Sequence, residues 1–426
     1  MMNIKNTSQS KNFIWNMAGS ISSALISVVL LMIVSRFLST SDSDVYAYAY
    51  SVGNLLVVIG LFQVRNFQAT DIGEKYSFSN YFLARLLTSL LMIIATIFFL
   101  LFMNFSNSKS QVVFFIAIYR LSDAISDLFQ GLFQQRERLD VAGKSLTYRN
   151  LLIFFTFMLS VLSTGDLLCS LKLVCIISYA FIFFFDMRIS YSFEKVIITK
   201  FFQKNEFLRV IQLLKESFPL FLNGFLIIYI YNQPKYSLDF LESVGKIQVG
   251  AQTIFNILFM PAFVMNLMML FFRPLITEMA VYILHDQLSH FKNLQKRLFL
   301  CLGILSLFVI LGSSLFGISI LEILYGENLQ DYWLTLLIIM IGGAVGSFAT
   351  AIDNILTAMR YQKYLLIPYG GAFVISQLST NFCIEELGIL GAAMSFLLTM
   401  IVWFLISVFI FKHVKKRKND KIERFF

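Results

Sequence analysis

The sequence predicts an all-α polytopic membrane protein, with about twelve transmembrane helices in two six-helix lobes around a central cavity and with both termini in the cytoplasm. Three observations predict this class. Of the 426 residues, 58% are hydrophobic and only 14% are charged, whereas charged residues are far more common in soluble domains. Apolar runs of about 20 residues, the length that crosses a bilayer as a helix, recur along the whole chain. Lysine and arginine concentrate in every second connection between these runs.

A β-barrel is the other architecture that can span a membrane. Its strands predict segments of about ten residues in which polarity alternates. The run LLTSLLMIIATIFFLLF, residues 86–102, shows no such alternation, so helices are expected. The first apolar stretch, Met17 to Leu38, is longer than the core of a signal peptide and lacks a small-residue cleavage site. It is therefore expected to remain as a transmembrane helix.

Twelve apolar spans can be read between polar breaks in the sequence. The fifth and seventh are short, and the longest internal connection separates the sixth from the seventh. This division predicts an N-terminal lobe over residues 1–187, a cytoplasmic inter-lobe loop over 188–216, a C-terminal lobe over 217–411 and a basic cytoplasmic tail over 412–426. Two lobes around a cavity suit a transporter with alternating access. The predicted spans are residues 17–38, 45–63, 82–103, 111–133, 150–164, 167–187, 217–233, 247–272, 297–320, 333–357, 364–382 and 388–411.

The distribution of charge supports this topology. With both termini inside, 28 lysines and arginines lie in internal segments, five lie in external ones, and Arg120 lies within a span, as the positive-inside rule predicts. The net charge of +9 then reflects topology and contact with anionic membrane lipids, so nucleic acid is not an expected partner. The four cysteines form no CxxC pair and the three histidines have no metal-binding spacing, so we expect no disulfide and no metal site.

The fourth span carries three ionisable residues. Its twelve Leu, Ile, Phe and Val residues contribute about −5 kcal/mol to insertion, and three charges at roughly +3 kcal/mol each outweigh that. These charges are therefore expected to face protein or water. At 100° per residue the polar residues of the span share one stripe about 80° wide, and they are Arg120, Asp123, Asp127, Gln130 and Gln134.

Two interpretations of this stripe stay open. It could line a cavity, in which Arg120 attracts an anion and Asp123 or Asp127 takes up a proton or Na⁺. It could instead be an internal Arg–Asp contact that holds helices together. The same choice applies to Gln252 and Asn256 in the eighth span, where amides could line a cavity or serve helix packing.

In the tenth span, Asp353 is a second candidate cation site, and an interhelical hydrogen bond is the alternative.

Four stretches resemble one known family. They are VRNFQATDIGEKYSFSNY at 64–81, YRLSDAISDLFQGLFQQRERLDVAGKSLTYR at 119–149, YNQPKYSLD at 231–239 and FMPAFVMNLMMLFFRPLITEM at 259–279. Together they are similar to the Wzx-type polysaccharide flippases of the multidrug/oligosaccharidyl-lipid/polysaccharide exporter (MOP) superfamily. The helix count and the division into six plus six agree with that family, so the resemblance covers nearly the whole chain.

The resemblance implies a transporter and not an enzyme. It implies that the chain moves a lipid-linked oligosaccharide, carried on undecaprenyl pyrophosphate, from the inner to the outer leaflet of the bacterial cytoplasmic membrane for surface polysaccharide assembly. The implied mechanism is alternating access, with Na⁺ or H⁺ as a candidate coupling ion and no other cofactor. The implied partners are the lipid-linked substrate, membrane lipids, a polysaccharide polymerase and glycosyltransferases.

A pyrophosphate cargo calls for fixed cations, and arginine contacts phosphate oxygens in a planar, bidentate way. Arg120 is the first candidate because of its depth in the membrane. Lys235 follows a proline at the outer end of the seventh span, although its alternative is ordinary snorkelling at the interface. Arg65 and Arg273 lie at the predicted cytoplasmic mouth, where the positive-inside rule alone could explain them. Arg36, at the outer end of the first span, is a secondary candidate.

Two other functions fit the same architecture. A cation-coupled drug or metabolite exporter of the same superfamily would favour carboxylates and aromatic residues in its cavity, whereas the fourth span offers a fixed cation. A membrane polysaccharide polymerase would carry a sizeable external loop with arginines, and the external loops expected here are short and poor in arginine.

Overall fold

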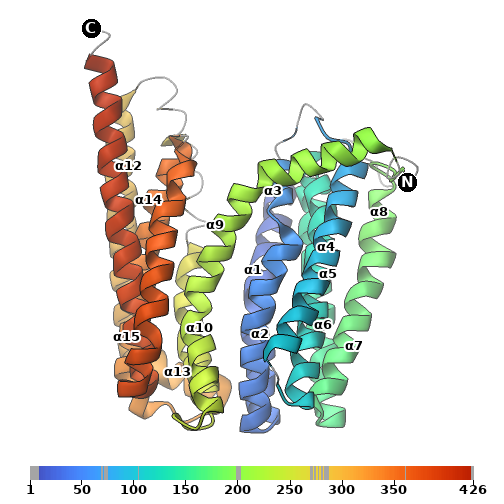
Figure 1. Cartoon of the computed structure of the whole chain (residues 1–426), viewed down its shortest axis with the longest axis vertical. Coiled ribbons are helices and arrows are strands. Elements are labelled where there is room, and N and C mark those ends of the chain that lie inside the picture. The colour runs from blue at the N-terminus through green and yellow to red at the C-terminus, as the bar shows by residue number, and fades with distance from the viewer. Residues whose placement is uncertain are drawn as a thin grey trace. The chain divides into compact units, whose positions relative to one another are not determined.

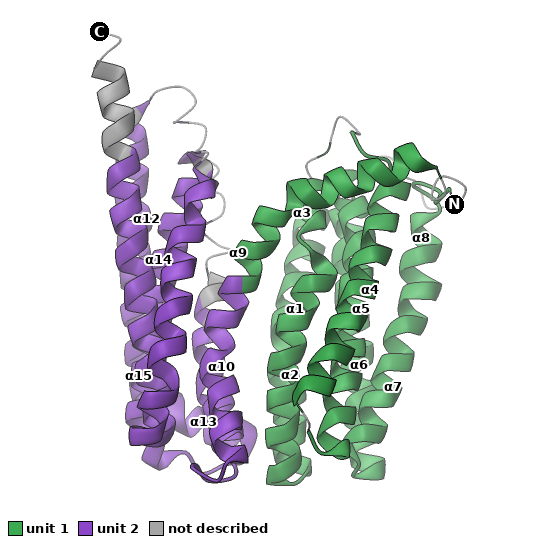
Figure 2. Cartoon of the chain, viewed as in Figure 1, with its two compact units in different colours: residues 1–225 green, residues 226–426 purple. Residues whose placement is uncertain are grey.

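The computed structural model describes residues 9–68, 71, 75–103, 105–197, 203–268, 287–359 and 361–423, together with 272, 275, 276, 278, 279 and 282. Every regular element in these ranges is a helix (Figure 1). The helices form two compact units, residues 1–225 and 226–426 (Figure 2).

Unit 1 is a bundle of long helices with short connections. Its elements are α1 (Gln9–Phe37), α2 (Thr40–Leu61), α3 (Val64–Gln68), α4 (Phe78–Met103), α5 (Asn107–Gln135), α6 (Leu139–Thr164), α7 (Leu167–Phe181), a π-helical turn (Ile182–Met187), α8 (Arg188–Ser190) and the first part of α9 (Lys204–Ser243). Side chains cap several helix starts. The hydroxyl of Ser39, for example, accepts a hydrogen bond from the Asp42 N–H at the start of α2, which satisfies a backbone donor that has no partner within the helix.

Two elements of unit 1 differ from the sequence-based expectation. The predicted fifth span, 150–164, is too short, because α6 starts at Leu139. The polar first half of α6 is helical because Ser145 and Arg149 are buried there with partners on other helices. The predicted inter-lobe loop also contains the start of α9, whose apolar residues Val210 and Leu213 pack into the core of unit 1. Figure 1 shows this part of α9 running across the end of the bundle.

That end of unit 1 is closed by aromatic packing and by close backbone approach. Phe62, in the left-handed conformation that ends α2, stacks on Phe221 of α9 with ring centroids 4.4 Å apart. Gly131 of α5 lets α3 come near, since a Cβ there would lie 2.2 Å from the side-chain amide of Gln68. The short helix α3 is thereby held against α5.

Unit 2 contains the rest of α9 and the C-terminal helices. Its other elements are α10 (Ala251–Met268), α12 (Leu288–Gly312), a π-helical turn (Ser313–Gly317), α13 (Ile318–Tyr325), a 3₁₀ turn (Gln330–Tyr332), α14 (Trp333–Ala358), a 3₁₀ turn (Gln362–Leu365) and α15 (Leu366–Glu423). The helix α15 is in fact two helices, because Gly388 breaks it with φ 59°. The break lies where the eleventh and twelfth predicted spans meet. The predicted seventh span, 217–233, is shorter than α9, which has 40 residues.

Nine helices in the described part of the chain are long and apolar enough to cross a membrane, and a shorter apolar helix covers Ala251–Ala262. Large apolar side chains such as Phe98, Phe308 and Phe409 are at least 70% exposed, as lipid-facing positions would be. The helix α5 is not among the nine, in keeping with the four charged residues within its length, Lys109, Arg120, Asp123 and Asp127. The predicted all-α, polytopic membrane fold is confirmed.

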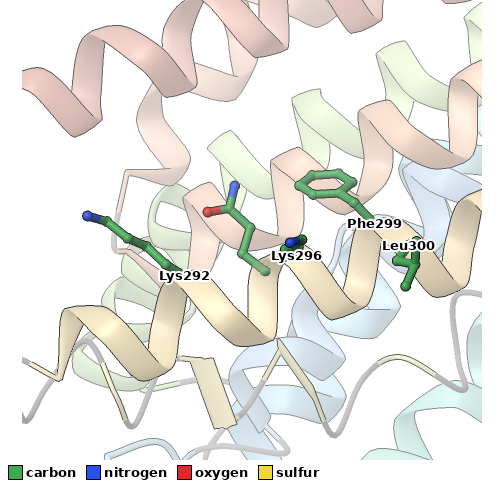
Figure 3. A pocket seen from close by; sticks show the side chains of 5 residues that line it. Lys292, Lys296, Phe299 and Leu300 are labelled. Carbon is green, nitrogen blue, oxygen red and sulfur yellow. The ribbon is translucent and has the colours of Figure 1, made fainter.

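A surface hollow of about 570 Å³ lies along α12 in unit 2. Figure 3 shows its lining, which comes from one helix: Lys292, Gln295, Lys296, Phe299 and Leu300. None of the predicted site residues lines it.

Candidate functional site

Asp127 on α5 lies between two arginines from other helices. Nη1 of Arg65, on α3, is 3.0 Å from one carboxylate oxygen, and Nη2 of Arg85, on α4, is 2.9 Å from the other. Arg85 also donates to the carbonyl oxygen of Gly60 on α2. Its side chain is 2% exposed, against 30% for Arg65. One carboxylate therefore joins a buried cation to a partly exposed one.

Arg65 also binds two other residues of the polar stripe of α5. It donates to Oε1 of Gln130 at 3.0 Å and to Oε1 of Gln134 at 3.2 Å. Asp127, Gln130 and Gln134 lie three and four residues apart, so a helix presents them on one face. The predicted stripe thus meets a single guanidinium at this end of α5.

Asp123, one turn before Asp127, is also shared by two arginines. Arg120 of the same helix contacts one carboxylate oxygen and Arg149 of α6 contacts the other. Arg149 donates in addition to the carbonyl oxygen of Ser122 at 3.2 Å. The guanidinium of Arg120 lies 5.5 Å from the ring centroid of Tyr50, a cation–π distance.

These six residues form one group, which we call the arginine cluster: Arg65, Arg85, Arg120 and Arg149 with Asp123 and Asp127. Its four guanidinium groups outnumber its carboxylates two to one, so the cluster carries an excess of positive charge. The two carboxylates and Arg120 are 16–20% exposed. Ionised groups do not face hydrocarbon without large cost, so the exposed side of the cluster must meet water.

Two of these arginines were not among the predicted site residues. Arg85 and Arg149 stand near the starts of their predicted spans, where the positive-inside rule explains an arginine without further function. Because α4 and α6 begin several residues earlier than predicted, both side chains lie inside the bundle, 2% and 4% exposed. Recognition of the longer helices would have identified them.

The sequence-based prediction also missed one acidic residue of unit 1. Asp186, in the π-helical turn that follows α7, is fully buried. One carboxylate oxygen accepts from the hydroxyl of Ser126 on α5 at 2.7 Å, and the other accepts from Ser145 on α6. A carboxylate inside the predicted sixth span was the signal that could have shown it.

The described site residues that were predicted in unit 2 lie on three helices, α9, α10 and α14. Lys235 on α9 is 8% exposed and its Nζ lies 4.6 Å from the ring centroid of Phe259. Among the described residues it has no ion-pair partner. On α10, Asn256 donates to the backbone oxygen of Gln252, and the buried side-chain amide of Gln252 has no hydrogen-bond partner within the described ranges.

Asp353 on α14 is 3% exposed and accepts two hydrogen bonds from α15. The indole N–H of Trp403 lies at 2.9 Å and the hydroxyl of Ser407 at 2.8 Å. The interhelical hydrogen bond predicted as the alternative for Asp353 is therefore present. Both donors are neutral, and no described cation pairs with this carboxylate.

Of the two remaining predicted cations, one lies apart from these groups and the other lies outside the described residues. Arg36 is exposed in the last turn of α1 and is not part of the arginine cluster. Arg273 lies outside the described residues. Within the part of the chain that the structure describes, no three His, Cys, Asp or Glu side chains are grouped as metal ligands would be.

The fold and the comparisons define the class of protein. Solved structures with the same fold include the lipid II flippase MurJ in its inward-closed conformation, which is 12% identical with a TM-score of 0.72 over 94% of this chain and 87% of that one. An inward-facing multidrug resistance MATE family transporter of the MOP superfamily is 12% identical, with a TM-score of 0.69 over 95% and 99%. The Vibrio cholerae MATE transporter VcmN is 12% identical, with a TM-score of 0.63 over 96% and 97%. The chain thus has the fold of the MOP-superfamily membrane transporters.

The family is defined by sequence. Residues 10–272 match the model of the polysaccharide biosynthesis protein family, and this protein belongs to that family. It is 25% identical over 175 residues to the capsular polysaccharide biosynthesis protein CapF of Staphylococcus aureus, a match that spans 40% of this chain and 43% of that relative. The predicted resemblance is thus confirmed for the family, which is that of the polysaccharide biosynthesis proteins, and for the fold, which is shared with the MurJ and MATE transporters.

Proposed function

We propose that this protein is a flippase that moves an oligosaccharide linked to undecaprenyl pyrophosphate from the inner to the outer leaflet of the bacterial cytoplasmic membrane. The observation that carries the proposal is the arginine cluster, an excess of guanidinium groups held within a membrane bundle. Membership of a polysaccharide biosynthesis family supports the class of cargo. A polymerase and glycosyltransferases are the proposed partners after and before the flipping step.

The chemistry of the cargo explains why the cluster is needed. A sugar head group that enters hydrocarbon loses hydrogen bonds to water, at a cost of about 2–7 kcal/mol for each polar group left unpaired. A hydrated route lined with protein polar groups removes most of that barrier. The pyrophosphate carries negative charge as well, which fixed guanidinium groups can neutralise through paired hydrogen bonds.

The four arginines divide into two roles by their exposure. Arg85 and Arg149 are buried and hold the carboxylates of the cluster. Arg65 and Arg120 are 30% and 20% exposed, so they are the ones that can exchange a carboxylate contact for a phosphate contact. We assign first contact with the pyrophosphate to Arg65 and Arg120.

In unit 2, Lys235 is the proposed second contact. It lies over the face of Phe259, and a buried ammonium without an anion gains most from a bound phosphate. Gln130, Gln134, Gln252 and Asn256 are proposed to serve as polar lining. Arg36 and Arg273 stay predictions for the two mouths of the route.

A coupling cation, Na⁺ or H⁺, is part of the proposal. Asp123 and Asp127 were predicted to take it up, but each already binds two guanidinium groups, which a second cation would have to displace. Asp353 binds only neutral donors and is the better of the three candidates. Uptake of a cation there would bias the return of the empty transporter.

Depletion of the protein in growing cells tests the function. Lipid-linked oligosaccharide should accumulate with its sugars inaccessible to a probe added outside the cell, while the total amount made stays unchanged. Re-expression of the wild-type chain should restore the accessible pool.

An exporter of organic cations is the second candidate, favoured by one observation: Asp353 lies among the aromatic side chains of Tyr369 and Trp403. For that function, depletion would leave the outer pool of lipid-linked oligosaccharide normal and would raise sensitivity to cationic drugs.

A further inference from the structure

The buried carboxylate of Asp186 is connected to the arginine cluster by hydrogen bonds. Nη1 of Arg65 donates to Oε1 of Gln130 at 3.0 Å, Nε2 of Gln130 donates to Ser126 at 3.2 Å, and Ser126 donates to Asp186 at 2.7 Å. Gln130, Ser126 and Asp186 are at most 3% exposed, while Arg65 reaches the exposed side. A single chain of bonds therefore runs from a buried acid to the partly exposed cation.

The direction of every bond in this chain is fixed by its ends. Arginine can only donate, so the amide oxygen of Gln130 must face Arg65 and its NH₂ group must face Ser126. An ionised carboxylate can only accept, so Ser126 must give its one proton to Asp186. The observed arrangement is complete only while the Asp186 oxygen that faces Ser126 carries no proton.

A proton on the Asp186 oxygen that faces Ser126 would reverse the chain. That oxygen then donates, Ser126 accepts, and the hydroxyl proton of Ser126 must turn to another acceptor. Rotation of the Gln130 amide supplies one, and it aims the NH₂ group at Arg65. Two donors cannot bond to each other, so Arg65 keeps Asp127 and Gln134 and loses one of its contacts.

The groups around Asp186 allow its carboxylate to take up a proton. Only hydroxyl groups bond to its oxygens in the described part of the chain, and the guanidinium that acts on it through space is that of Arg149, already bonded to Asp123. The turn that carries Asp186 is π-helical, a geometry that is frequent at functional sites. The other titratable groups on the elements packed against it are Lys109, Tyr119, Arg120, Asp123 and Asp127 on α5, Asp140, Lys144 and Tyr148 on α6, Cys169, Lys172, Cys175 and Tyr179 on α7, and Arg188 on α8.

We propose that Asp186 is a proton-binding site and that, through Ser126 and Gln130, its protonation loosens Arg65 and so strengthens anion binding at the arginine cluster. This inference rests on the proposed function, because it makes proton uptake the event that prepares the cluster for pyrophosphate. Asp186 acts here as a positioning residue. By linkage, a bound anion must in turn favour protonation of Asp186.

The test is calorimetric titration of the purified full-length protein with inorganic pyrophosphate over a range of pH, in buffers of different ionisation enthalpy so that protons taken up are counted. Wild type should bind more tightly as pH falls and take up a proton. Asp186→Asn, whose amide imitates the protonated acid, should bind roughly tenfold more tightly than wild type at high pH and lose this uptake. Pyrophosphate itself also gains protons as pH falls, but this happens equally with wild type and with Asp186→Asn, so it cancels when the two proteins are compared.

Two serine variants separate coupling from packing. Ser126→Ala removes a member of the chain to Arg65, whereas Ser145→Ala removes the other hydroxyl on the same carboxylate, which lies off that chain. We expect Ser126→Ala to lose the linked proton and Ser145→Ala to keep it. Equal behaviour of the two variants, or wild-type proton uptake in Asp186→Asn, would overturn the proposal.

An infrared titration tests the proton site at Asp186 independently of the proposed function. A carboxylic acid band that grows as pH falls in wild type and is missing in Asp186→Asn would identify the proton site without any ligand, and its absence from wild type would overturn it. Failure of pyrophosphate to bind at any pH would count against the arginine cluster as an anion site, and so against both the proposed function and the coupling step.

Discussion

Arg85 of α4 lies 2.9 Å from the carboxylate of Asp127 on α5, and its side chain is only 2% exposed. Breaking a buried ion pair costs about 3–5 kcal/mol when the remaining charge has no other partner, and this is an upper bound for Arg85 because Arg65 still pairs with Asp127. Arg85→Met should therefore lower the thermal unfolding midpoint of the detergent-solubilised protein markedly. The measurement is the unfolding temperature followed by helix content.

Arg65 provides the matched control, since it contacts the same carboxylate but is 30% exposed. Arg65→Met should lose about 1 kcal/mol or less, as partly exposed pairs do, while weakening pyrophosphate binding. If the two variants proved equally unstable, burial would not be what distinguishes these arginines, and the division into holding and contacting roles would be wrong.

A second prediction concerns Arg120, which the sequence singled out because of its depth. Arg120→Gln removes the charge but keeps a polar, though shorter, side chain, so the variant should reach the membrane at normal levels and fail to support flipping. Arg120→Lys should retain part of the activity, because an ammonium keeps the charge but not the bidentate geometry. Full complementation of a depleted strain by Arg120→Gln would remove Arg120 from the cargo route.

The sequence predicted the fold class and the polar face of α5 because both follow from local patterns, hydrophobic run length and helical spacing. It could not predict that Arg85 and Arg149 are buried partners of Asp127 and Asp123, since those contacts join residues 42 and 26 positions apart in the chain. The count of positive charges even favoured the wrong interpretation of Arg85 and Arg149, because the positive-inside rule by itself explains an arginine near a helix end. Asp186 was missed for a related reason, as its hydroxyl partners lie on two other helices.

A third prediction uses the contact between Lys75 and Glu216, which fastens the start of α9 to the connection before α4. The ammonium of Lys75 lies 2.7 Å from Glu216, and this hydrogen bond raises the pKa of Lys75 above its ordinary 10.5. A cation with a raised pKa stabilises the fold fully below its unfolded pKa, and that stabilisation disappears as pH rises through the folded pKa. The contact should thus stabilise the protein at neutral pH and cease to do so in strong alkali.

A double-mutant cycle on unfolding temperature measures this effect, with Lys75→Met, Glu216→Gln and the double variant compared at neutral pH and well above pH 10.5. We expect a small favourable coupling at neutral pH that vanishes at high pH. High salt should weaken it as well, because the pair is exposed. A coupling that is the same at both pH values would contradict the assignment.

The last prediction concerns Asp353, whose carboxylate oxygens accept from Trp403 and Ser407. An asparagine at this position can accept from the indole N–H and donate to the hydroxyl, so Asp353→Asn should fold and remain stable. Asp353→Ala leaves both donors without a buried acceptor, at about 1–3 kcal/mol for each, and should unfold at a clearly lower temperature. The stable Asn variant then isolates the role of the charge.

Indole emission reports that charge directly, because the chain has three tryptophans and the other two, Trp15 and Trp333, can be replaced by Phe. In the resulting protein, addition or loss of charge on Asp353 next to the indole N–H should shift the emission of Trp403. A shift with pH in the absence of Na⁺ would identify the proton as the ion bound there, and a shift on adding Na⁺ at constant pH would identify the metal ion. Asp353→Asn should show neither shift. If wild type is equally silent in both titrations, Asp353 only joins α14 to α15, and the proposal of a coupling cation at this residue would be wrong.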